Sequence, residues 1–231
     1  MSRPTPTHNR TLRSRPYSPP QFAALILSLL LAACTTPAPS SFAGSHTVST
    51  SSDLQAQVAM GRKLVLSHAC GECHGIADDP ASVGWLDGVR DTLIQEYHIG
   101  PYTTRPKNLT PDNLTGTGRF TERQLFNALR YGLRPEETPD VDITSMVPGQ
   151  GNFPLHPHYL APPMPWPSWR YMSDEELYAI AAYLKNGLKP VRHQVKDSDG
   201  PPDFWASAYT VDKIGPYPAA AYPTAHETGG K

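Results

Sequence analysis

Apolar residues recur at helical spacing in three stretches of the chain, and the first stretch runs from about Asp53 to Ala69. Its apolar positions include Leu54, Val58, Val65 and Leu66. This spacing predicts a helix with one side facing the core. Gly61 lies in the middle of the stretch, where glycine is less favourable than alanine in a helix. We therefore predict that another helix approaches closely at Gly61.

The second and third stretches cover residues 122–131 and 174–186. Each follows a hydroxyl residue with a capping-box partner three positions later, and each ends at a glycine. The signals are Thr121, Gln124 and Gly132 for the second stretch and Ser173, Glu176 and Gly187 for the third. The pattern predicts an all-α fold in which the first and last helices pack together. The 26 prolines indicate that long irregular loops connect the helices.

The N-terminal residues resemble an export signal. A basic stretch ending at Arg15 precedes an apolar run from Phe22 to Ala33, which is too short to span a bilayer. The run ends in Leu31-Ala32-Ala33-Cys34, which resembles a bacterial lipobox. We expect residues 1–33 to be removed and Cys34 to be lipidated, with an ordinary secretory signal as the alternative. Residues 34–52, rich in small and polar residues, are predicted to be a flexible tether.

The segment Cys70-Gly71-Glu72-Cys73-His74 carries the strongest chemical signal in the chain. Two thiols at this spacing can both reach the vinyl groups of one haem, and the adjacent imidazole can then bind the iron. A thioredoxin-like redox pair would need a βαβ context, and a zinc site would need further Cys or His ligands nearby. The sequence shows neither feature. We therefore predict one covalently attached haem c, with Cys70 and Cys73 as attachment points and His74 as proximal ligand.

Charge and cysteine content limit the class of partner and the covalent bonds that the chain can form. The chain carries a net charge of −1, and removal of residues 1–33 would take away four arginines and no acidic residue, leaving about −5. Such a surface has no attraction for nucleic acid, but it suits a redox partner with a positive docking face. The chain has three cysteines. Cys34, Cys70 and Cys73 account for all of them, so no structural disulfide is expected.

Met164 is the predicted distal iron ligand. It lies in Ala161-Pro162-Pro163-Met164-Pro165-Trp166, where prolines on both sides stiffen the loop. A thioether ligand raises the reduction potential of a haem and suits electron transfer. The other methionines fit less well, because Met60 precedes the attachment motif and Met172 adjoins a helix cap, and Met146 is the reserve candidate. Histidine ligation is the open alternative, with His156, His158 and His193 as its candidates.

Several strings of residues together resemble one known family. They are Asn108–Asp112, Thr115–Gly118, Phe120-Thr121, Pro163–Trp166 and Ser173–Leu177. These strings, over about residues 54–188, resemble the cytochrome c domains of membrane-bound dehydrogenase subunits, including those of bacterial alcohol and gluconate dehydrogenases. The resemblance implies a class I-like cytochrome c fold over residues 53–188, with the cofactor ligands named above.

The resemblance also implies roles for residues around the haem edge. Asn108 and Thr110 would hydrogen-bond a propionate or neighbouring backbone, with a turn-forming structural role as the alternative. Arg105 is a candidate for neutralising a propionate. This chain departs from the family in having one haem motif, a long connection over residues 134–163, and an irregular C-terminal extension over residues 189–231. The departures affect the identity of the partner more than the haem chemistry.

The sequence thus predicts a single-haem electron carrier, anchored by lipid to the periplasmic side of a bacterial membrane. A dehydrogenase or respiratory complex would reduce it, and another cytochrome or an oxidase would oxidise it, with no substrate turnover at the iron. One alternative is the haem subunit of a specific dehydrogenase complex. Others are a haem peroxidase or gas sensor, each needing an open iron position, and a structural haem in a protein whose proline-rich extensions assemble a larger complex.

Overall fold

The structure is a computed structural model that describes residues 51–90 and 96–216 of the 231-residue chain. The predicted signal segment 1–33, Cys34 and nearly all of the predicted tether lie outside the described residues, as does the end of the predicted C-terminal extension. None of the helices in the described part is both long and apolar enough to cross a membrane.

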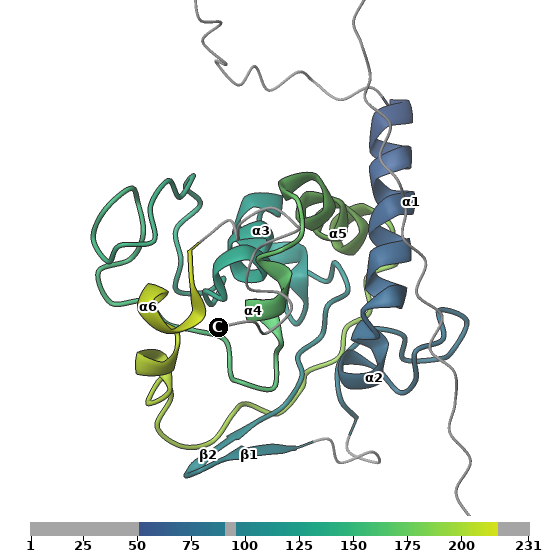
Figure 1. Ribbon diagram of the computed structural model, residues 1–231. Coiled ribbons are helices and arrows are strands. Elements are labelled where there is room, and N and C mark those ends of the chain that lie inside the picture. The colour runs from purple at the N-terminus through teal and green to yellow at the C-terminus, as the bar shows by residue number, and fades with distance from the viewer. Residues whose placement is uncertain (1–50, 91–95, 217–231) are drawn as a thin grey trace, which may run out of the picture. The chain divides into compact units, whose positions relative to one another are not determined.

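The first predicted helix forms, but it ends before the cysteine motif. α1 spans Ser51–Ser67, and α2, Cys70–His74, is a separate short helix (Figure 1). Ala69 between them has a positive φ of 51°, in the left-handed conformation, which interrupts the helix. The side chain of Ser67 donates a hydrogen bond to the carbonyl of Leu64 at 3.1 Å. The motif is therefore carried by its own turn of helix rather than by the end of α1.

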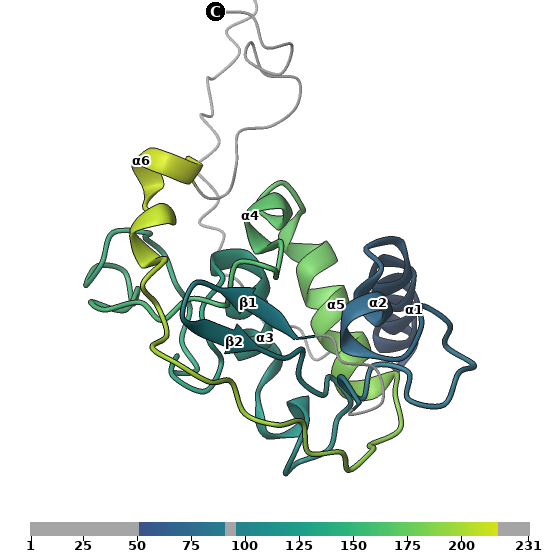
Figure 2. The same cartoon turned by 90° about the horizontal axis from the view of Figure 1, so that it is seen from below.

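α1 packs against α5, which spans Asp174–Asn186 (Figures 1 and 2). A Cβ atom added at Gly61 would lie 1.8 Å from the carbonyl oxygen of Ala179. Only glycine permits so close an approach without displacing one helix, because the obstructing atom belongs to the backbone. The predicted pairing of the first and last helices and the close approach at Gly61 are both confirmed.

The two predicted capping boxes both form. Before α3, Glu122–Tyr131, the Thr121 hydroxyl accepts from the N–H of Gln124 at 3.1 Å, and the Gln124 side chain accepts from the N–H of Thr121 at 3.1 Å. The equivalent pair forms before α5. Gly132 ends α3 in the left-handed conformation, with φ of 68°. These boundaries agree with the sequence because capping depends on neighbouring residues alone.

Arg130 joins the end of α3 to the start of α5. Its guanidinium is buried and donates to the carbonyls of Arg170 and Met172 at 3.0 and 2.9 Å. It also pairs with the carboxylate of Asp174 at 2.5 Å. A buried charge is tolerated only when it is paired and hydrogen-bonded, and these contacts meet that need. The short helix α4, Trp166–Trp169, lies between the two joined helices in the chain.

A small antiparallel sheet accompanies the helices, which differs from the all-α expectation. β1, Tyr97–Ile99, pairs with β2, Tyr102–Thr104, so that His98 lies opposite Thr103. The described fold is mostly helical, with α6, Val211–Ile214, and two 3₁₀ turns, Thr117–Arg119 and Ala206–Ala208, completing it. Strands of three residues are too short to show an alternating pattern in the sequence.

The described part of the C-terminal extension wraps the domain. Thr103 and Asp199 exchange backbone hydrogen bonds of 2.8 and 2.9 Å, and the ring of Trp205 packs 5.0 Å from that of Tyr102. Figure 2 shows this segment passing from the α1 and α5 side of the molecule, along the sheet, to α6. We call residues 189–202 the strap. The long loop over residues 139–157 extends on the side of α3 that faces away from α1 (Figure 1).

Candidate haem site

A cavity of about 770 Å³ lies beside α2, a volume within the range of cofactor sites. It is bounded by α1, α2, β2, α3, the loop before α4, α5 and the strap. Cys70, Cys73, His74 and Met164 all line it. The structure therefore brings the four predicted cofactor-binding side chains to one cavity, although Met164 is far from the others along the chain.

The two motif cysteines are half-buried free thiols. Burial, with a smaller contribution from the nearby carboxylate of Asp78, raises the pKa of Cys70 to about 12, so this thiol stays protonated. The sulfur of Cys73 lies 3.1 Å from the hydroxyl of Tyr97. That hydrogen bond, together with burial, raises the pKa of Tyr97 to about 12. Over the described residues, both motif cysteines are thus free thiols beside the cavity.

Trp85 holds α2 in place. A Cβ atom at Gly71 would lie 2.2 Å from the indole ring, so the ring packs directly on the backbone of the motif. The indole N–H donates to the hydroxyl of Tyr183 on α5 at 3.1 Å. The N–H of Gly71 donates to the carboxylate of Asp78 at 3.2 Å. The motif is therefore fixed against both α5 and the loop that follows it.

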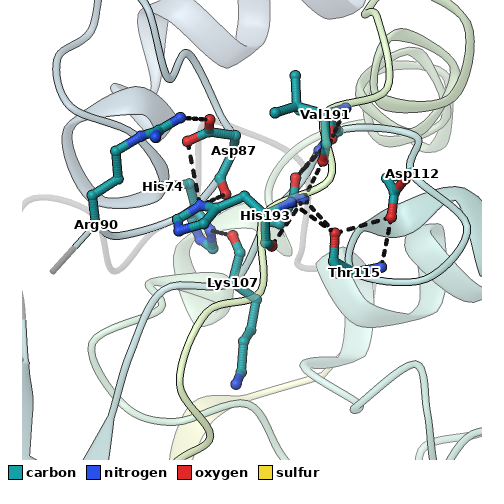
Figure 3. Close-up of polar contacts among 10 residues, drawn as sticks. His74, Asp87, Arg90, Lys107, Asp112, Thr115, Val191 and His193 are labelled. Atoms are coloured by element: carbon teal, nitrogen blue, oxygen red, sulfur yellow. Dashed lines mark hydrogen bonds and ion pairs between the residues drawn. The ribbon is translucent and has the colours of Figure 1, made fainter.

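The imidazole of His74 is oriented by the backbone of Lys107. Nδ1 donates to the Lys107 carbonyl at 2.7 Å (Figure 3), which leaves Nε2 as the nitrogen available to a metal. Burial lowers the pKa of His74, and the Lys107 carbonyl opposes this effect only in part. The neutral imidazole is the form that binds metals. A histidine held in this way has the geometry and protonation state of a haem ligand.

A network of polar contacts supports the proximal side of the site (Figure 3). The N–H of Gly88 donates to the carbonyl of His74 at 2.8 Å. His193 of the strap has its Nδ1 2.8 Å from the carbonyl of Asp87, whose carboxylate pairs with Arg90. The N–H of His193 donates to Thr115 at 3.1 Å. The strap thus contacts the loop that contains Asp87 and Gly88, and Gly88 is the residue that donates to the His74 carbonyl.

Met164 lies in a loop held at both ends. Its N–H donates to the carbonyl of Ala161 at 2.9 Å, and its carbonyl accepts from Trp166 at 2.9 Å. The side chain is half-buried and lines the cavity. The alternative candidates, Met146, Met172, His156, His158 and His193, do not line it. The geometry favours Met164 among the candidates considered from the sequence.

Asn108 and Thr110 make internal contacts. The Asn108 carbonyl oxygen accepts from the N–H and hydroxyl of Thr110, both at 2.8 Å, and its amide donates to the carbonyl of Val191 at 2.8 Å. This is the turn-forming role considered as the alternative from the sequence. The guanidinium of Arg105 pairs with Glu96 and Asp199. The contact of Arg105 with a propionate stays a prediction.

Sequence reasoning did not identify three residues of the site, namely Trp85, Tyr97 and Lys107. Lys107 acts through its backbone carbonyl, and a carbonyl carries no residue-type signal. Trp85 and Tyr97 are aromatic residues near the motif in sequence, but their contacts depend on how the intervening loop folds. The only available signal was their proximity to the motif.

The residues present fit a covalently bound haem better than the alternatives. Two thiols, an imidazole with one nitrogen free and a thioether form the donor set of a c-type haem. Over residues 51–90 and 96–216, no three His, Cys, Asp or Glu side chains cluster in a way that could hold a metal ion. The described strands form only an antiparallel pair, so the parallel βαβ unit of a thioredoxin-like site is absent from these residues.

Comparison with known proteins points the same way, although no protein-family model matches the chain. It is 30% identical over 146 residues to a gluconate 2-dehydrogenase cytochrome c subunit from Pantoea cypripedii, covering 63% of this chain and 26% of that protein. It is 32% identical over 92 residues to the cytochrome c subunit of a quinone alcohol dehydrogenase from Gluconacetobacter polyoxogenes, covering 40% and 15%. A fructose dehydrogenase cytochrome subunit from Gluconobacter japonicus is 24% identical over 134 residues, covering 58% and 22%.

The chain therefore resembles cytochrome c subunits of dehydrogenases, as predicted from the sequence, and this resemblance implies haem c as its cofactor. The chain spans about a quarter or less of the length of these relatives.

Proposed function

We propose that this protein is a single-haem c-type cytochrome that carries electrons. Cys70 and Cys73 attach the haem, and His74 and Met164 are its axial ligands, within a cytochrome c fold. Their thiols would form thioether bonds to the two vinyl groups of the haem, and no oxidant would be needed because each thiol hydrogen would go to the vinyl carbon next to the new bond. The observation that carries the proposal is the convergence of these four side chains on one cavity.

The ligand set determines the kind of chemistry. When bound, the haem iron supplies one-electron redox chemistry. The hydrogen bond from Nδ1 of His74 to the Lys107 carbonyl leaves Nε2 as the nitrogen that would bind the iron, and the loop held at both ends would present the Met164 thioether. With His74 and Met164 both supplying donor atoms to the iron, no position on it would be left open for a substrate. This arrangement supports electron transfer over a peroxidase or a gas sensor.

The proposal extends to location and partners. Cys34 carries lipid that tethers the protein to the periplasmic side of a bacterial membrane, and the partners are a dehydrogenase or respiratory complex on one side and another cytochrome or oxidase on the other. The narrower candidate is the haem subunit of one dehydrogenase complex. Its support is that several relatives are named as cytochrome subunits of gluconate, alcohol and fructose dehydrogenases.

The haem and its ligands can be tested together. The protein is expressed with a c-type haem maturation system, and the haem content and attachment are measured by the pyridine haemochrome spectrum and by mass under denaturing conditions. We expect one haem per chain that remains attached, and loss of attachment when Cys70 and Cys73 are both replaced by alanine. A haem that dissociates from the denatured native chain would refute covalent attachment.

The distal ligand is tested with matched methionine variants. Met164→Ala should abolish the methionine–iron charge-transfer band in the far-red spectrum and allow rapid binding of carbon monoxide. Met146→Ala, a half-buried methionine away from the cavity, is the control and should retain the native spectrum. Loss of the band in the Met146 variant alone would assign the ligand to that residue. Rapid carbon monoxide binding by the native protein would instead support the gas-sensor alternative.

The partner is identified by isolating the lipidated protein from solubilised membranes of the native host. Co-purification with one dehydrogenase in fixed stoichiometry, and loss of electron flow from that enzyme without this chain, would select the narrower candidate. Reduction by several donors without a stable complex would select the general carrier.

A further inference from the structure

The last described segment of the chain packs behind the methionine loop. We call this segment, Asp203–Gly215, the C-terminal clamp. Its Tyr209 is half-buried, with its ring centroid 4.9 Å from that of Trp166 and 5.4 Å from that of Tyr159, both in edge-on geometry. Neither Tyr209 nor Trp166 lines the cavity. Tyr209 therefore contacts the residues that hold the site rather than the site itself.

Tyr159 and Trp166 flank the methionine loop on its two sides in the chain. Their rings stack at 5.7 Å with an interplanar angle of 2°, which closes the loop at its base. Trp166 is fully buried, and its indole lies so close to Gly132 that a Cβ there would be 2.1 Å from the ring. Gly132 also accepts a hydrogen bond from Leu160 at 2.6 Å. The position of Met164 thus depends on the seating of Trp166 between Gly132 and the Tyr159 and Tyr209 rings.

Both ends of the clamp lie close to residues that flank the methionine loop and α4. At its start, the carboxylate of Asp203 pairs with Arg134 at 3.0 Å and with His158 at 2.8 Å. Arg134 in turn donates to the carbonyl of Tyr159 at 2.9 Å. At its end, Gly215 lies against the guanidinium of Arg170, which follows α4 directly. The clamp is therefore held by ion pairs at its start, packs at its end close to the residue that follows α4, and contacts the Tyr159 and Trp166 rings between.

We propose that the C-terminal clamp is a positioning device that keeps Met164 on the haem iron, with Tyr209 acting through Trp166. The inference rests on the proposed function, in which Met164 is the distal ligand. When the methionine loop moves away from the haem, the iron is exposed to other ligands. Packing of Tyr209 on the Tyr159 and Trp166 rings at the base of this loop therefore lowers the fraction of molecules in which the loop is open. Each aromatic pair adds stabilisation beyond the area that it buries, and Tyr209 contributes two such pairs.

The test compares three variants of the haem-loaded full chain. Tyr209→Ala removes both ring contacts. Tyr209→Phe keeps the ring and removes only the hydroxyl. Phe204→Ala is the matched control, because Phe204 is a half-exposed ring of the same segment that packs on Trp205 and not on Trp166. The rate of carbon monoxide binding to the reduced protein and the pH at which the methionine–iron band is lost are measured for each variant.

We expect Tyr209→Ala to bind carbon monoxide at least about fivefold faster than the native protein. It should also lose the methionine–iron band at a lower pH than the native protein does. Tyr209→Phe and Phe204→Ala should match the native protein in both measurements. Thermal unfolding of both alanine variants separates loop opening from a general loss of stability. Tyr209→Ala and Phe204→Ala each remove one partly exposed ring, so their unfolding temperatures should be similar while their rates of carbon monoxide binding differ.

The outcomes are distinguishable. If the native protein lacks the methionine–iron band, the proposed distal ligand fails, and the clamp fails with it. If the band is present but Tyr209→Ala binds carbon monoxide at the native rate, the clamp alone is overturned. An equal acceleration in Phe204→Ala also overturns it, because the effect would then follow from stability. If Tyr209→Ala does not fold, Tyr209→Leu, which keeps apolar volume without the ring, should show the same acceleration.

Discussion

Replacement of Gly61 by alanine sets two effects of opposite sign against each other at the α1–α5 crossing. In a helix interior, alanine is favoured over glycine by about 0.8–1.0 kcal/mol, so helix propensity alone would stabilise the variant. The added Cβ, however, would lie 1.8 Å from the oxygen and 2.5 Å from the carbon of the Ala179 carbonyl. No rotamer change can move these backbone atoms, so the two helices must separate.

The steric effect is the larger of the two. Overpacking in a core costs about 1–3 kcal/mol and occasionally more, and this clash falls at the severe end because it involves backbone. Subtracting the propensity gain leaves a loss of about 2 kcal/mol in the free energy of unfolding. For a chain of this size, that corresponds to a fall of about 4–8 °C in Tm. Val65 and Ile180 line the cavity from these two helices, so the haem absorption spectrum should change as well.

The assay is thermal and urea unfolding of the haem-loaded protein, followed by far-ultraviolet circular dichroism. Ala59→Gly is the control, because Ala59 is exposed on the same helix and its replacement reports helix propensity without a steric effect. It should lower stability by about 1 kcal/mol and leave the haem spectrum unchanged. A Gly61→Ala variant as stable as the native protein, or more so, would show that the crossing is not close enough for sterics to outweigh propensity.

Three further predictions follow from other parts of the chain. Cys34→Ser should move the protein from the membrane to the soluble fraction, as judged by fractionation, and continued membrane attachment would contradict lipidation at this residue. Tyr183→Phe should lower the free energy of unfolding by about 1–3 kcal/mol in urea titrations, because the indole N–H of Trp85 loses its buried acceptor; an unchanged midpoint would show that another group accepts this hydrogen. Hydrogen bonds from Thr115, chiefly from its backbone, hold the pKa of Asp112 below its ordinary value. The resulting stabilisation of the folded state is complete at pH values above that ordinary pKa and is lost as the pH falls through the lower pKa of the folded state. Asp112→Asn should therefore lose less stability than the native protein between about pH 4 and pH 2. Equal acid-unfolding profiles for the two proteins would contradict this role of Asp112.

Local sequence signals predicted the elements whose boundaries depend on neighbouring residues. The capping boxes at Thr121 and Ser173 form as expected, because each needs only two side chains three residues apart. The predicted end of the first helix, at about Ala69, lies two residues beyond the observed end of α1 at Ser67. The left-handed residue Ala69 precedes Gly71, which packs on Trp85, and this contact with a later loop cannot be read from helical periodicity.

Gly61 shows where sequence reasoning reached tertiary structure. A glycine inside a helix pattern is unfavourable unless something requires it, and this reasoning predicted a close helix approach that the structure confirms. Arg105 shows the opposite case. The family resemblance implies a contact with a propionate, which stays a prediction, and the sequence does not reveal that the Arg105 guanidinium also pairs with Glu96 and with Asp199 of the strap. Nothing local in the sequence indicates that a residue so late in the chain returns to this position.

The sequence by itself predicted the chemistry that five consecutive residues can encode, namely a haem-attachment motif from Cys70 to His74, and it determined the helices with their caps. Tertiary structure alone decided that Met164 shares a cavity with that motif, that the Lys107 carbonyl selects the free nitrogen of His74, and that Tyr209 packs behind the methionine loop. The physical reason is the range of the interactions. Covalent spacing and helix capping act between neighbours, whereas cavity walls, carbonyl directions and ring contacts depend on where distant segments pack.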